Sequence, residues 1–210
     1  KNKIYLDANI IYGFFRAKYK ELKTAEGFIE PKVIEFLREN KEKFEYYVST
    51  IVRVEIIRRL RTEMHLSETD TLELWLSFRK YLDVEEFEEK EIDWELINAI
   101  VLKVEIKKRL SNLIHLSVCK KNDFWLLTGD NEILEKCKNF YSKVMDYIEL
   151  RRLAESLNNV QADNYYESRE RLQNSHQEAG RKEGKGFGTN ENNKQGRIRK
   201  GKRADRKKAP

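Results

Sequence analysis

Short apolar runs alternate along the chain with longer segments of helical periodicity, and this alternation limits the fold more than any other feature. The clearest runs are Ile4–Leu6, Tyr46–Ser49 and Phe124–Leu127. Each is compact and apolar or aromatic, which predicts a buried strand. Strands separated by helices favour a parallel sheet. The sequence therefore predicts an α/β fold, a three-layer sandwich with a mostly parallel central sheet.

The segments between these runs carry the periodicity and the terminal signals of helices. Pro31 suits a first helical turn, and Ser67 followed by Asp70 resembles a capping box. In the helix that begins near Thr50, the side chains expected to face the core are those of Ile51, Val54, Ile56 and Ile57. Further helices are expected over residues 9–20, from 67 to about 82, from 93 past 104, and over 111–121, 131–137 and 148–157, with short strands at 84–88 and 143–146.

The composition changes near residue 158, beyond which large apolar residues almost vanish. A segment of this kind cannot bury enough surface to offset its chain entropy. We therefore expect residues 1–157 to form one domain and residues 158–210 to form a disordered C-terminal tail.

The basic character of the chain belongs to this tail. Residues 181–210 hold 12 Lys and Arg and 3 acids, whereas residues 1–180 hold 30 Lys and Arg and 33 acids. A cationic tail should bind phosphates without sequence preference, and a purely solvating tail is the alternative. The cations expected to contact RNA are Arg197, Arg199, Lys200, Lys202 and Arg203.

The cysteines and the apolar runs indicate the setting of the protein. Cys119 and Cys137 show neither the spacing of a metal site nor a disulfide framework, which predicts a reduced, cytoplasmic environment. No apolar run approaches the roughly 18 residues of a membrane span, and no signal-peptide pattern is present. We therefore expect no association with a membrane.

Acidic side chains follow the three clearest strands. Asp7 comes directly after the first run, Glu55 lies in the helix after the second, and Asp130 follows the third. Open α/β sheets bind their ligands at this edge, where three converging carboxylates would repel one another without a divalent cation. Oxygen ligands select Mg²⁺ or Mn²⁺, which can activate water and stabilise charge on a phosphodiester. The pattern predicts a metal-dependent nuclease.

Each of these acids also has a structural interpretation. Asp7 and Asp130 could cap the helices that follow them through their side chains. Glu55 could be a solvated helix residue paired with Arg58 or Arg59. The residues alone leave these alternatives open.

Three motifs, in order, resemble those of the PIN-domain ribonucleases, a family that includes the VapC-like toxins of toxin–antitoxin pairs. The motifs are LDAN at Leu6–Asn9, VSTIVRVEI at Val48–Ile56 and SNLIHLSVCKKNDFWLLTGDNEI at Ser111–Ile133. The resemblance spans roughly residues 3–150. It implies a small α/β fold and a metal-dependent endoribonuclease that hydrolyses RNA.

The resemblance also implies a role for individual residues. Asp7, Glu55 and Asp130 match the catalytic acids of the family. Mg²⁺ or Mn²⁺ would be held by Asp7 and Asp130, with the amide oxygen of Asn112 as a further ligand. The supporting residues are Asn9, Asn112 and Thr128.

Asn112 departs from the family pattern. The third acid of the family stands three residues before a His, and His115 fills that His position. An amide oxygen can ligate a metal but carries no charge, so the change should weaken divalent binding. Asn112 is either natural or an inactivating substitution, and it could also cap its helix. The alternative function is a catalytically impaired PIN module that binds RNA or protein. We expect His115 to be structural or hydrogen-bonded rather than a ligand.

The resemblance extends to partners. A toxin implies an antitoxin that covers the acidic cleft with an Arg or Lys. The apolar helix Leu72–Leu82 is a candidate surface for a homodimer or another partner, by analogy with the family alone.

Overall fold

The structure is a computed structural model that describes residues 1–24, 26–89, 92–105, 107 and 110–159. The basic tail and its predicted RNA-contacting cations, from Arg197 to Arg203, lie outside the described residues and stay predictions.

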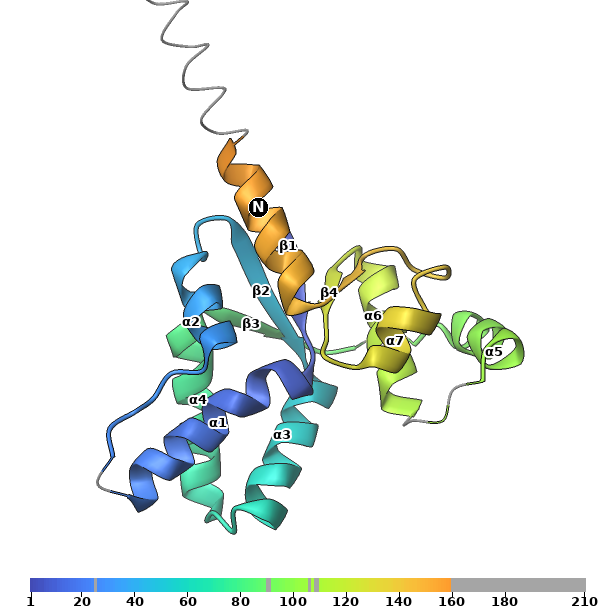
Figure 1. The fold of residues 1–210 in the computed structure, drawn as a ribbon. Helices are drawn as coiled ribbons and strands as arrows, with labels where there is room; N and C mark the ends of the chain where they lie inside the picture. Colours follow the sequence, from blue (N-terminus) through green and yellow to red (C-terminus); the bar gives the residue numbers. More distant parts are fainter. Residues whose placement is uncertain (25, 90–91, 106, 108–109, 160–210) are drawn as a thin grey trace, which may run out of the picture. The chain divides into compact units, whose positions relative to one another are not determined.

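Five strands form one sheet, in the order β3–β2–β1–β4–β5, and all neighbouring pairs are parallel (Figure 1). The predicted α/β fold with a parallel central sheet is therefore confirmed. The strands are β1 (Asn2–Leu6), β2 (Phe44–Ser49), β3 (Val84–Phe87), β4 (Trp125–Leu127) and β5 (Val144–Met145).

Helices cover both faces of the sheet, as the connections between parallel strands require. α1 packs against α2, α3 and α4 on one face, and α5 packs against α6 on the other, which also carries α7 (Figure 1). The helices are α1 (Ala8–Lys23), α2 (Lys32–Glu39), α3 (Thr50–Glu63), α4 (Glu68–Leu82), α5 (Trp94–Lys103), α6 (Leu110–Asn122) and α7 (Asn131–Lys136), followed by a last helix over residues 147–159.

The central strand β1 is buried on both faces. Ile4, Tyr5 and Leu6 are fully inaccessible to solvent, which explains why this strand reads as a continuous apolar run rather than as an alternating one. Tyr5 pairs with Tyr47 of β2 and Leu126 of β4 in the parallel register.

The buried face of α3 differs from the predicted one. Val52, Ile56 and Leu60 are fully buried, whereas Val54 is 56% exposed. Spacings of four residues place the three buried side chains in one line along the helix, and Val54 lies about 200° around the axis from Val52. The prediction that Val54 faces the core was wrong. Only the side chains on one face of the helix reach the core, and Val54 is apolar but lies off that face.

The predicted helix starts are confirmed at two caps. The Ser67 hydroxyl accepts a hydrogen bond from the backbone nitrogen of Asp70 at 3.1 Å, at the start of α4. Asp93 Oδ1 accepts one from the nitrogen of Leu96 at 2.9 Å, at the start of α5. α5 ends at Lys103 and does not continue past Val104, where the chain becomes extended.

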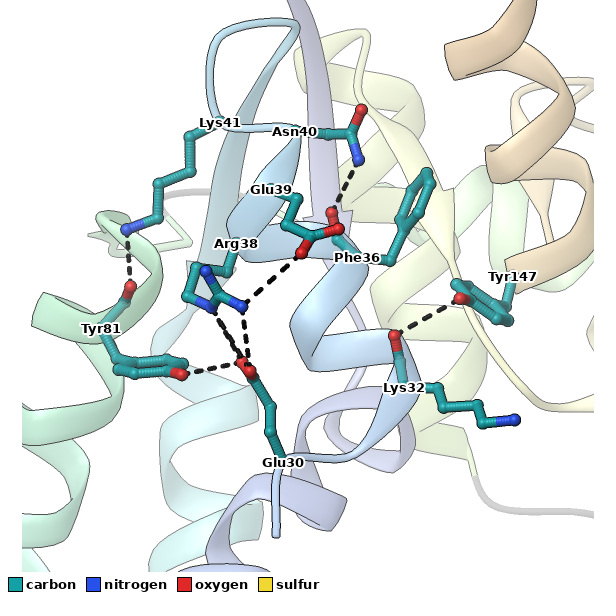
Figure 2. Close-up of polar contacts among 9 residues, drawn as sticks. All are labelled: Glu30, Lys32, Phe36, Arg38, Glu39, Asn40, Lys41, Tyr81 and Tyr147. Carbon is teal, nitrogen blue, oxygen red and sulfur yellow. Dashed lines mark hydrogen bonds and ion pairs between the residues drawn. The ribbon is translucent and has the colours of Figure 1, made fainter. Parts of the chain in front are cut away.

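A polar network that includes an ion pair joins the α2 region to α4 (Figure 2). Arg38 donates from Nε and Nη2 to the carboxylate of Glu30, which also accepts from the Tyr81 hydroxyl at 2.8 Å. Lys41 donates to the carbonyl oxygen of Tyr81. The two contacts of Tyr81 span 40 and 51 residues of sequence, so they fix the position of α2 beside α4 on this face of the sheet.

None of the described helices is long and apolar enough to cross a lipid bilayer. Cys119 and Cys137 are buried and unpaired.

The topology places a reversal at β1. From β1 the chain moves to β2 and then β3 on one side, and it later returns to β4 and β5 on the other side. Parallel strands put their carboxyl ends at one edge, and a crevice forms where the direction of the connections reverses. The loops after β1 and β4 flank that crevice.

Candidate active site

A cleft of about 430 Å³ opens at the carboxyl edge of the sheet, at the reversal beside β1. Its lining includes the three acids that the sequence singled out, Asp7, Glu55 and Asp130. The other side chains that line it include Asn9, Asn112, Arg58, Arg59, Glu63 and Lys107. The fold therefore brings together residues that are up to 123 positions apart in the sequence.

Asp7 is buried at the end of β1, with 6% of its surface exposed. Its Oδ2 accepts hydrogen bonds from the Thr128 hydroxyl at 2.6 Å and from Asn9 Nδ2 at 2.9 Å. Asp7 occupies the N-cap position of α1, but its side chain makes no capping hydrogen bond. The carboxylate is thus turned to the site, and the capping interpretation does not account for it.

The environment of Asp7 is unfavourable to its charge. Burial raises the pKa of the Asp7 carboxyl above its ordinary value of 3.8, and the nearby charge of Glu55 raises it further. His115 and the Thr128 hydroxyl act in the opposite direction and lower this pKa. A buried acid whose pKa is raised by its surroundings is a feature of functional sites.

Thr128 joins the loops after β1 and β4. Its hydroxyl donates to Asp7 and accepts a hydrogen bond from the backbone nitrogen of Asp130 at 3.1 Å. Asn9 makes a second link, because its Oδ1 accepts from the backbone nitrogen of Gly129 at 3.0 Å. Thr128 and Asn9, two of the three predicted supporting residues, therefore lie where they can hold Asp7 and the Asp130 loop in a fixed relation.

Asp130 caps a helix, as the structural alternative expected. Its Oδ1 accepts from the backbone nitrogen of Glu132 at 2.9 Å, at the start of α7. Its Oδ2 accepts from Asn112 Nδ2 at 2.7 Å. Both oxygens of this carboxylate are therefore engaged by donors from the protein.

Asn112 lies in the first turn of α6 and contacts Asp130 through its nitrogen. Since a carboxylate can only accept, the amide must present its NH₂ group to Asp130. The amide oxygen, which the sequence suggested as a metal ligand, belongs to the other branch of the side chain. Asn112 thus acts here as a hydrogen-bond donor to Asp130.

Glu55 comes from the second turn of α3 and faces His115 of α6. The distance from Glu55 Oε2 to His115 Nε2 is 3.4 Å. His115 is 1% exposed, and its Nδ1 lies 2.7 Å from the Tyr5 hydroxyl, which lies 2.7 Å from Ser49 Oγ. The hydrogen bond expected of His115 is therefore present at Nδ1, with the Tyr5 hydroxyl as its partner.

Sequence reasoning missed Tyr5 and Ser49. Both lie within apolar strands and were read as core residues. The available signal was the hydroxyl of Tyr5, because a buried tyrosine needs a hydrogen-bond partner that an apolar strand cannot supply.

Among the described residues, Asp7, Glu55 and His115 form a group that could hold a metal ion. Each offers one ligand atom, and these atoms lie within 4.8 Å of one another. Asp130, which was predicted as a ligand with Asp7 and Asn112, is not a member of this group. Two carboxylates and an imidazole form a donor set that suits a divalent cation.

The comparison with known protein families agrees with the fold. A family model described as PIN domain matches residues 4–139. The chain belongs to the PIN-domain family. PIN domains are generally nucleases and generally use divalent metal ions. The resemblance seen in the motifs is therefore confirmed at the level of the family.

One solved structure similar to this PIN domain is the crystal structure of VapBC2 from Rickettsia felis bound to a DNA fragment from their promoter. The similar chain is 12% identical, with a TM-score of 0.48, and the match covers 69% of this chain and 98% of that chain. No curated protein matches the sequence.

Proposed function

We propose that this PIN domain is a metal-dependent endoribonuclease that hydrolyses phosphodiester bonds of RNA. The observation that carries the proposal is the burial of Asp7 beside Glu55 in the cleft at the reversal of the sheet. A buried carboxylate next to a second one is costly without a cation. A site that retains both is best explained by the binding of a divalent ion.

Mg²⁺ or Mn²⁺ would be held by Asp7 and Glu55, and when bound it would supply Lewis-acid stabilisation of charge on the phosphate and activation of the attacking water. The protein supplies the positioning. Thr128 and Asn9 fix the orientation of the Asp7 carboxylate through Oδ2. Asp130 holds the start of α7 beside the cleft.

Cationic side chains at the same cleft favour a phosphodiester substrate. Arg58, Arg59 and Lys107 line it together with the acids. The Arg59 guanidinium lies over the ring of Tyr12, 3.2 Å from the centroid, and its Nε donates to Glu63 at 3.1 Å. These contacts hold one cation in place, and guanidinium groups bind phosphate oxygens in pairs. The cleft thus combines ligands for an ion with donors for the substrate backbone.

The basic tail is proposed to raise RNA affinity without sequence preference, through Arg197, Arg199, Lys200, Lys202 and Arg203. Its role is proposed to be independent of the chemistry in the cleft, because the acids and the hydrogen bonds described for them lie within residues 7–132.

Two partners follow from the proposed function if the chain is a toxin. An antitoxin that inserts an Arg or Lys beside Asp7 would compete with the cation and block the cleft. A homodimer or partner surface is proposed on α4, where Leu72 and Leu76 are 46% and 59% exposed. Val54 of α3, the helix that packs against α4, is also exposed.

The second candidate function is a catalytically impaired PIN module that binds RNA or a protein. It is favoured by one observation, the neutral amide of Asn112 in place of a third acid. With its nitrogen bound to Asp130, this side chain adds no negative charge to the cleft.

Cleavage of single-stranded RNA in Mn²⁺ by this chain and by its Asn112→Asp variant separates the two functions. The nuclease proposal predicts cleavage by the unchanged chain. Cleavage by the Asp variant alone would identify this chain as an impaired module. Cleavage by neither, with both chains folded by circular dichroism, would remove the nuclease proposal.

A further inference from the structure

We propose that His115 is itself a metal ligand, and that Asp7, Glu55 and His115 form a mixed carboxylate–imidazole site that prefers Mn²⁺ to Mg²⁺. This inference rests on the proposed metal-dependent function and deepens it, because it names the ligand that replaces the third acid and the class of ion that results.

The first support is the distance between the donor atoms. Glu55 Oε2 and His115 Nε2 are 3.4 Å apart, and the candidate atoms of all three residues lie within 4.8 Å of one another. Ligands about 2.1 Å from an octahedral ion are about 3 Å apart when adjacent and about 4.2 Å apart when opposite. Small rotations of the side chains therefore bring these atoms to coordination distance.

The second support is that the Glu55–His115 contact is a poor hydrogen bond. A charge-assisted bond from an imidazole N–H to a carboxylate is typically about 2.7–2.9 Å long. The 3.4 Å separation exceeds that range. This separation also matches that of two adjacent ligands of one ion.

The third support lies on the other side of the imidazole ring. His115 Nδ1 is 2.7 Å from the Tyr5 hydroxyl, which is 2.7 Å from Ser49 Oγ. The Tyr5 hydroxyl can accept a hydrogen bond from Nδ1–H of His115 while it donates its own hydrogen to Ser49 Oγ. This arrangement leaves the lone pair of Nε2 directed to the carboxylates, and metal-binding histidines usually fix their other nitrogen in this way.

The buried chain Ser49–Tyr5–His115 holds the ring rigidly, since all three side chains are almost inaccessible to solvent. Tyr5 comes from the central strand β1 and Ser49 from the end of β2. The imidazole is therefore positioned by the sheet itself, as a ligand must be.

The fourth support is the position of His115 on α6. It lies three residues after Asn112, which places both side chains on the same face of the helix. Asn112 donates a hydrogen bond to Asp130 through its nitrogen. The third metal ligand therefore comes from the next turn of α6, where His115 lies. An imidazole nitrogen suits first-row transition ions, whereas Mg²⁺ demands oxygen ligands.

Two substitutions of His115 provide a matched pair for the test. Asn carries its amide at the place of Nδ1, so His115→Asn can keep the contact with Tyr5 while removing Nε2. Gln carries its amide near the place of Nε2, so His115→Gln retains an oxygen there. The full-length chain is used in each case, and thermal unfolding in EDTA shows whether the variants fold.

Titration calorimetry with Mn²⁺ and with Mg²⁺ gives the first readout. We expect His115→Asn to weaken Mn²⁺ binding at least about tenfold and Mg²⁺ binding by a much smaller factor. His115→Gln should lose part of the preference for Mn²⁺. An equal loss for both ions in the Asn variant would overturn the inference, because a purely structural role does not discriminate between ions.

Electron spin-echo spectroscopy of the Mn²⁺-loaded protein gives the second readout and does not depend on a variant. We expect modulation from a directly coordinated imidazole nitrogen. Bound Mn²⁺ without this modulation would overturn the assignment of His115, and RNA cleavage by the same sample would leave the proposed nuclease intact. If the chain binds no Mn²⁺ and cleaves no RNA, both the inference and the proposed function fail.

Discussion

Asn112 Nδ2 donates to Asp130 Oδ2 across 2.7 Å, and this bond joins the first turn of α6 to the start of α7. The contact shows what Asn112 does at the position where the family has its third acid. A carboxylate at position 112 would face a second carboxylate at hydrogen-bond distance, whereas the amide satisfies it. The present side chain therefore stabilises the metal-free cleft and reduces its negative charge.

The first prediction concerns Asn112→Asp. The new charge should lower the free energy of unfolding of the metal-free protein by about 1–2 kcal/mol, because the carboxylate of Asp130 loses a donor and gains a like charge. The same charge should raise the affinity for Mg²⁺. Urea unfolding in EDTA and titration calorimetry measure the two effects.

Asn112→Ala serves as the control for that prediction, because it removes the hydrogen bond without adding charge. It should lose stability but gain no affinity for Mg²⁺. An unchanged Mg²⁺ affinity in the Asp variant would show that position 112 does not act on the metal site.

The second prediction concerns pH and the Asp7→Asn variant in EDTA. The folded-state pKa of Asp7 is raised above 3.8, so the folded protein holds this proton more tightly than the unfolded chain. The ionised group therefore costs no stability below about pH 3.8, and its cost grows as the pH rises through the folded pKa. The Asn variant should gain stability relative to the unchanged protein between pH 4 and pH 7.

Denaturant unfolding at several pH values in that interval measures this gain. A stability difference between the two proteins that is the same at every pH would contradict the account of Asp7 as a desolvated acid. The comparison requires that the Asp7→Asn variant is folded at each pH before denaturant is added.

The third prediction concerns the hydroxyl of Thr128, which bonds both Asp7 and the backbone of Asp130. Thr128→Val keeps the shape but leaves these buried partners without the hydroxyl, which should cost about 1–3 kcal/mol of unfolding free energy. Thr128→Ser keeps the hydroxyl and should cost less. A Val variant as stable as the Ser variant would show that the hydroxyl does not hold the site together.

The fourth prediction concerns Arg58, an exposed cation at the cleft. Arg58→Gln should weaken RNA binding and reduce the slope of log affinity against log salt by about one. Lys120→Gln is the matched control, because Lys120 is exposed near the C-terminal end of α6 and does not line the cleft. Equal effects of the two substitutions in a filter-binding titration would place RNA elsewhere on the protein.

The sheet and the three acids could be predicted because their signals are local. Each acid lies within six residues of the end of its apolar run, and parallel pairing brings the strand ends together. The residues around the acids could not be predicted in the same way. The contact between Tyr5 and His115 spans 110 positions, and no local pattern records such a pair.

The error at Val54 and the outcome at Asp130 have different causes. Val54 is apolar but lies off the buried line of α3, so composition without helix phase misled the prediction. Asp130 has both a capping bond and a place in the cleft. The sequence offered helix capping and a place in the cleft as alternatives, and the structure shows that the Asp130 carboxylate combines the two.

Cleavage of single-stranded RNA by the full chain and by Asp7→Asn, each with Mn²⁺ and with EDTA, tests whether Asp7 holds a catalytic ion. We expect the unchanged chain to cleave RNA in Mn²⁺ but not in EDTA, and the variant to cleave at least about 100-fold more slowly in Mn²⁺, because Asp7 holds the ion. Cleavage that persists in EDTA, or an Asp7→Asn variant as active as the unchanged chain, would contradict metal-dependent cleavage through Asp7.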